Sequence, residues 1–122
     1  MHAPLGMHIG VHLGVLVTTI SLLGTQAAAF PCTFTTECYE AEACQTAAFD
    51  VEVDIGAEAL STQAGNVIIV AVRETEQLTT LFASGQGAEY MMSITPTAAR
   101  MTSHTNDGPQ VISYLGHCKG AF

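Results

Sequence analysis

The sequence predicts an all-β protein: a small antiparallel meander of short strands, closed as a barrel or packed as a sandwich. Two observations predict this class. After residue 29, short runs of alternating apolar and polar residues are separated by glycine, proline and asparagine, and no run shows a convincing helical period. Four cysteines lie near the two ends of the same region, which is typical of a small domain stabilised by disulfides.

Residues 1–29 predict a secretory signal peptide, and residues 30–122 predict a single domain. The apolar run 11–23 has signal-peptide length, and small residues at 27–29 form a cleavage pattern before Phe30. No Lys or Arg precedes the run, so an uncleaved anchor is the alternative, although a bilayer span needs about 20 apolar residues. We therefore expect a periplasmic or secreted protein with no membrane contact after cleavage.

The cysteine spacing favours disulfides over a metal site. Cys32, Cys38 and Cys44 are six residues apart, whereas zinc ligands usually come in pairs two to four residues apart. The favoured pairing is Cys38–Cys44 as a local loop and Cys32–Cys118 as a bridge between the two ends. That long bridge would stabilise the fold by about 4–5 kcal/mol in the loop-entropy model. The pairing of Cys32 with Cys38 and of Cys44 with Cys118 stays open.

A half-buried strand is predicted over residues 48–55. Asp50, Glu52 and Asp54 alternate there with four apolar residues, so the three carboxylates share one face. Carboxylates two apart on a strand stand about 7 Å apart and do not converge on calcium without a second element. We interpret this face as a solvated one.

The remaining chain predicts further strands joined by tight turns. The continuous β-branched run 67–72 predicts the most buried strand, and residues 56–66 predict a loop with one short helical turn. Strands are also expected at 78–83, 88–95, 98–105 and 111–118, with a turn at Asn106 to Pro109. The last strand places Ile112, Tyr114, Gly116 and Cys118 on one face.

The charge balance limits the classes of partner. The chain has 11 acidic and 3 basic residues, all after residue 30. A strongly acidic surface repels phosphate backbones and anionic lipid, so nucleic acid and membrane surfaces are not expected as partners. The charge suits a cationic protein or small ligand, and a charge that serves solubility alone is the alternative.

Candidate chemistry is sparse. His104 and His117 fall in adjacent expected strands, where with Asp107 or Asp50 they could form a metal or acid–base site. No serine lies in a G-x-S-x-G elbow, and all four cysteines are expected in bridges. We therefore expect no enzymatic activity and no cofactor; a small metal-dependent or hydrolytic site on the two histidines is the alternative.

Two short elements carry a resemblance. The last strand, Tyr114 to Cys118, looks like that of small exported bacterial proteins of unknown function. Together with Ser84-Gly85 followed by Tyr90, and a late cysteine tied to an early one, it resembles the periplasmic inhibitors of C-type lysozyme, the MliC family. That resemblance implies a small antiparallel barrel and carries over Ser84 and Tyr90 as partner contacts.

The sequence as a whole predicts an exported, non-enzymatic binding module with an unknown protein or small-ligand partner. A lysozyme-inhibitor-like protein is one form of that hypothesis. A purely structural component of the cell envelope is a further alternative.

Overall fold

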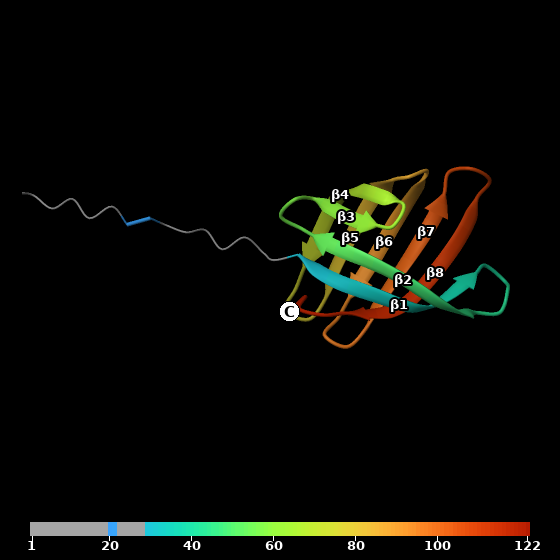
Figure 1. The fold of residues 1–122 in the computed structure, drawn as a ribbon, viewed down its shortest axis with the longest axis horizontal. Helices are drawn as coiled ribbons and strands as arrows, with labels where there is room; N and C mark the ends of the chain where they lie inside the picture. Colours follow the sequence, from blue (N-terminus) through green and yellow to red (C-terminus); the bar gives the residue numbers. More distant parts are fainter. Residues whose placement is uncertain (1–19, 22–28) are drawn as a thin grey trace, which may run out of the picture.

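The computed structural model describes residues 20–21 and 29–122, and its strands form one closed antiparallel barrel (Figure 1). The strands are β1 (Phe30–Tyr39), β2 (Gln45–Asp54), β3 (Ala59–Thr62), β4 (Gly65–Glu74), β5 (Thr79–Gly85), β6 (Ala88–Ile94), β7 (Ala99–Thr105) and β8 (Gln110–Cys118). Each strand pairs with the next, and β8 pairs back with β1. The all-β prediction is confirmed, and the architecture is a barrel.

The predicted leader, apart from residues 20, 21 and 29, lies outside the described residues. Strand β1 begins at Phe30, the residue that follows the small-residue pattern. Among the described residues, no helix has the length and apolar character needed to cross a membrane.

The core fills the inside of the barrel. Successive side chains of a strand point to opposite faces, so every second residue faces inward. In β2, Val51 and Val53 are buried while Asp50 and Glu52 are exposed, as the alternation predicts. The largest fully buried side chains are Phe34, Leu60, Leu81, Met92, Ile94, Met101, Val53, Val67 and Cys32.

Two sequence predictions were wrong. The segment 56–66 holds strand β3 and two turns in place of a loop with a helical turn. The run 67–72 is not the most buried strand, because Ile68 and Val70 are 65% and 64% exposed. A barrel wall is a single layer, so only alternate residues of this apolar run, Val67 and Ile69, face the core.

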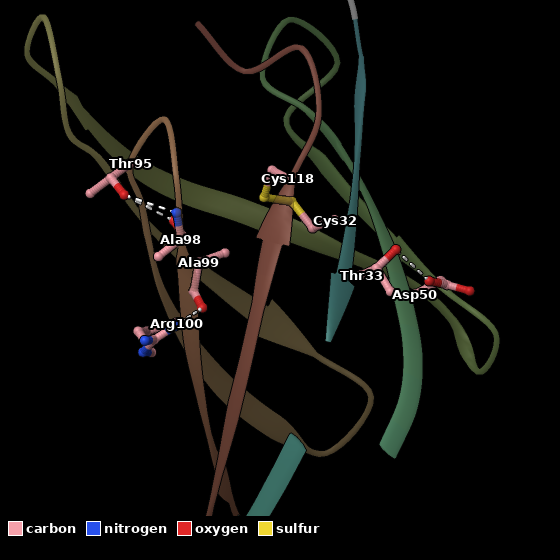
Figure 2. The surroundings of a disulfide bond; sticks show 8 residues. All are labelled: Cys32, Thr33, Asp50, Thr95, Ala98, Ala99, Arg100 and Cys118. Carbon is pink, nitrogen blue, oxygen red and sulfur yellow. Dashed lines mark hydrogen bonds between the residues drawn. A yellow bond between two sulfur atoms is a disulfide. The ribbon is translucent and has the colours of Figure 1, made fainter. Parts of the chain in front are cut away.

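The seam between β1 and β8 closes the barrel and carries the first disulfide. Cys32 and Cys118 are direct partners in the register, with Cα atoms 3.9 Å apart (Figure 2). Cys38 and Cys44 form the second disulfide across the β1–β2 turn. This is the favoured pairing, which the structure confirms. No described cysteine is free.

A bulge on β1 changes which side chains face inward. The β1–β8 register shifts between Phe34 and Thr36. Before the shift Phe34 points into the core, and after it Glu37 pairs with Tyr114, which packs against the core. Tyr39 pairs with Ile112, which is also the register partner of the buried Ser103 and so faces inward. Without the extra residue, simple alternation would place Glu37 and Tyr39 outside.

Gly116 lies opposite this bulge, where the two backbones approach closely. A Cβ atom on Gly116 would collide with the carbonyl oxygen of Thr33 and stand 2.7 Å from the Cα of Phe34. Both are backbone atoms, which cannot move aside as a flexible side chain can. The seam therefore requires glycine at this position.

The two ends of the barrel differ. The turns at 40–44, 63–64, 86–87 and 106–109 lie at one end, which we call the open end, and the chain enters and leaves at the other (Figure 1). Strand β3 pairs only with Glu52 to Asp54 of β2. Among the described residues, nothing pairs with that edge of β2 from residue 45 to 51, so this edge forms one side of the open end.

The first prediction concerns the two disulfides. Replacing Cys32 and Cys118 with Ala should lower the free energy of unfolding by about 4–5 kcal/mol, because this bridge spans 86 residues. The matched double replacement of Cys38 and Cys44, which span 6 residues, should cost about 2 kcal/mol. Urea denaturation of the three proteins measures both, and equal losses would contradict the loop-length explanation.

The second prediction concerns the close approach at the seam. Gly116→Ala should destabilise the barrel by at least about 2 kcal/mol, since the new methyl group meets immovable backbone. Gly120→Ala is the control: Gly120 has a positive φ of 75° but open space around it, so its cost should stay near 1 kcal/mol. Thermal and urea unfolding compare the two, and a Gly116→Ala protein of unchanged stability would be inconsistent with this contact.

Candidate functional site

The two histidines do not converge. His104 pairs with Val111 in the β7–β8 hairpin, and His117 lies six residues further along β8. Six residues of strand span roughly 20 Å, so the two imidazoles lie far apart. The expectation that they could approach each other across the Asn106 turn was wrong.

Neither histidine has the predicted carboxylate as a close partner in the register. Asp107 lies in the β7–β8 turn, far along β8 from His117. Asp50 and His117 flank Thr33 on either side, two strand spacings or about 10 Å apart. Among the described residues, no group of three or more His, Cys, Asp or Glu side chains could hold a metal ion.

Ser84 and Tyr90, the two residues carried over from the lysozyme-inhibitor resemblance, lie on opposite faces of the sheet. Tyr90 pairs with Ala83, whose side chain is buried in the core, so Tyr90 faces inward. Ser84 faces outward and donates a hydrogen bond of 3.0 Å to the Glu89 carboxylate. These two side chains do not form one continuous contact surface.

Acidic side chains concentrate on β2 and in the turns before and after it, a surface that we call the acidic face. Residues 30–72 contain seven of the eleven carboxylates and none of the three basic residues, which are Arg73, Arg100 and Lys119. A shallow hollow of about 290 Å³ lies in this face, at the fork where β3 leaves β2. It is lined by Pro31, Asp50, Val51, Glu52, Ser61, Thr62 and Gln63.

The carboxylate of Asp50 is oriented by its neighbour. Thr33, its partner on β1, donates a hydrogen bond of 2.9 Å from its hydroxyl to Oδ1 of Asp50 (Figure 2). Oδ2 remains able to accept from a ligand. Glu52 lies on the same exposed face two residues along β2, so two carboxylates flank the hollow.

A second feature lies inside the barrel at the open end, and sequence reasoning did not identify it. All three tyrosines of the chain face inward in this half of the barrel, at half-buried positions. Tyr39 and Tyr90 belong to one row of paired residues that runs through Ile112 and Ser103. Tyr114 pairs with Glu37 in the next row. We call Glu37, Tyr39, Tyr90 and Tyr114 the tyrosine cluster.

Two phenylalanine rings pack against the cluster on the side toward the core. The ring of Phe49 stacks on Tyr114 with centroids 5.0 Å apart, and the buried Phe34 lies 6.0 Å from the same ring. Burial raises the pKa of the Tyr114 hydroxyl above its ordinary value of 10.0. The nearby Tyr39, Glu37 and Tyr90 raise this pKa further, because each disfavours a second negative charge.

The hydroxyl groups of the cluster have no partners within the described part of the chain. No side-chain hydrogen bond engages a tyrosine hydroxyl or the Glu37 carboxylate there. No described side-chain polar atom is both fully buried and unpaired, so water reaches these groups. The hydroxyl groups and the Glu37 carboxylate therefore remain free to bond to a ligand.

No protein-family model matches the chain, and comparisons with curated proteins and with solved structures also find no match. The resemblance to the lysozyme inhibitors thus receives no support from these comparisons. The structure itself shows a small, disulfide-bonded, eight-stranded antiparallel barrel.

The third prediction follows from the raised pKa of Tyr114. The folded protein holds the Tyr114 hydroxyl proton to higher pH than the unfolded chain does. The contribution of this group to the free energy of unfolding is therefore complete below about pH 10, and it is lost as pH rises through the pKa of the folded state. Urea unfolding of the wild type should therefore show falling stability above about pH 10. Tyr114→Phe should show a shallower fall; equal slopes in the two proteins would count against a raised pKa.

Proposed function

We propose that this chain is an exported, non-enzymatic binding protein of the periplasm or extracellular space, and that it recognises a cationic partner through its acidic face. The observation that carries the proposal is the hollow between β2 and β3. It is flanked by Asp50 and Glu52, in the part of the sequence that contains no basic residue. A cationic side chain would find two carboxylates there. The nearest basic residue in the register is Lys119, whose backbone N–H donates to the carbonyl of Pro31 across β1.

The disulfides support the location. Two bridges with no free described cysteine are typical of a chain that folds in an oxidising compartment outside the cytosol. The predicted leader agrees with this assignment. Disulfides suit a small barrel, whose core alone supplies limited stability.

The energetics favour fast, salt-sensitive recognition over tight binding at the hollow. An exposed ion pair contributes roughly 0–1 kcal/mol, so Asp50 and Glu52 alone would not hold a partner. Their larger effect is on association, because the summed negative field of the acidic face steers a cationic partner toward it. Tight binding needs further contacts outside the hollow.

The resemblance to C-type lysozyme inhibitors gives the proposal one specific form, with a cationic lysozyme as the partner. Size, barrel closure and the early-to-late cysteine bridge support this form. A partner on the outer surface would meet Ser84, whereas it would reach Tyr90 only through the open end. C-type lysozyme is therefore a suitable first protein probe.

The fourth prediction tests the acidic face with two cationic probes, C-type lysozyme and a lysine-rich peptide. The double variant Asp50→Asn, Glu52→Gln should bind at least one probe about fivefold more weakly at low salt, mostly through slower association. The control is Glu74→Gln, Glu76→Gln, which removes the same charge at the far end of β4 and should change affinity by less than about twofold.

Biolayer interferometry over a range of salt concentrations gives both rates. Equal weakening by the two double variants would mean that net charge alone attracts the probe and that the hollow is not a site. Absence of wild-type binding to either probe would remove the support for a cationic partner.

A further inference from the structure

The open end combines three features: aromatic rings, a carboxylate beside them, and an unpaired strand edge. The acidic hollow shares only the last residues of that edge, Asp50 and Val51, and has no aromatic ring. The rings and the carboxylate belong to the tyrosine cluster. Its side chains face the barrel interior and are half-buried. The edge is that of β2 from residue 45 to 51. Each feature favours a particular part of one kind of ligand.

The tyrosine cluster favours an organic cation. The face of an aromatic ring carries partial negative charge, so several rings around one point attract ammonium and guanidinium groups. Glu37, the register partner of Tyr114, adds a full negative charge beside the rings. An anionic ligand would be repelled by this carboxylate and by a surface with a formal net charge of −8.

The unpaired edge of β2 favours a ligand with a peptide backbone. A strand edge presents alternating N–H and C=O groups that can pair with an added strand. One edge of β2 is hydrogen-bonded to β1. Among the described residues, the opposite edge is free from residue 45 to 51. Because alternate side chains of an added strand point the same way, some of them would face the barrel interior.

A second copy of this chain is a poor occupant of the same edge. Each copy carries a formal charge of −8, and Asp50 lies on β2 itself, so two such edges would repel. The partner that fits both the edge and the rings is a basic peptide segment.

We propose that the open end is a receptor site for an extended basic peptide, whose backbone adds to the free edge of β2 and whose Arg or Lys side chain enters the tyrosine cluster beside Glu37. This site rests on the proposed cationic partner and supplies the contacts that the shallow hollow lacks. Tyr39, Tyr90 and Tyr114 provide ring faces and free hydroxyls, and Glu37 neutralises the cation.

The probe is a blocked peptide in which Arg and Thr alternate, about seven residues long to match the free edge. Three control ligands have the same length or charge chemistry: the peptide with citrulline for arginine, the peptide methylated on its backbone nitrogens, and choline. The chain has 3 Tyr and no Trp, so tyrosine fluorescence reports directly on the cluster. Binding should change this emission.

The expected results are specific to each part of the site. Glu37→Gln and Tyr90→Leu should each weaken peptide binding about tenfold, whereas Tyr90→Phe, which keeps the ring, should stay within about threefold of wild type. Citrulline and backbone methylation should each weaken binding about tenfold or more. Unfolding curves of the variants exclude loss of fold, and the peptide controls need no variant at all.

Several outcomes would overturn the inference. Equal affinity for the arginine and citrulline peptides would show that no cation is recognised, and full affinity of the methylated peptide would show that β2 accepts no added strand. Choline binding as tightly as the peptide would assign the cluster to small cations instead. If only Asp50→Asn, Glu52→Gln weakens binding, this site fails while the acidic face stands; if no variant matters, both fail.

Discussion

Closure of the seam between β1 and β8 is the constraint on which the rest of the fold depends. A single-layer sheet has no core until its first and last strands meet, because only then are the inward faces shielded from water. Here the meeting is covalent at Cys32 and Cys118 and steric at Gly116, whose missing side chain lets the two backbones approach. The bulge that this approach accommodates also sets which β1 side chains reach the interior.

Much of this fold could be predicted from local pattern. Alternation predicted the two faces of β2, and the cysteine positions in a chain expected to be exported favoured the pairing that the structure shows. Other features depend on tertiary context. The run 67–72 was predicted to be the most buried strand because it is a continuous series of apolar β-branched residues. Such a series does not reveal whether a second layer covers the sheet. Barrel and sandwich share the same period of two, so the pattern could not separate them.

The candidate sites were harder to predict, for a different reason. The two histidines looked close because they flank one turn, yet hairpin register places residues at unequal distances from a turn far apart. Conversely, Tyr39 and Tyr114 are distant in sequence and meet only because β8 returns to β1. The bulge after Phe34 reverses the alternation, which brings Glu37 and Tyr39 inside. Nothing in the local sequence marks that reversal.

The bridge between Cys32 and Cys118 also bears on how the molecule survives cleavage. The two cysteines are 86 residues apart in the sequence, so the bridge closes nearly the whole barrel into one covalent ring. A protease that cuts any single turn within that ring opens it without releasing a fragment, since the two pieces remain joined through sulfur. Exposed turns are where such cuts concentrate, so a nicked barrel can retain all its strands and reclose around the same core.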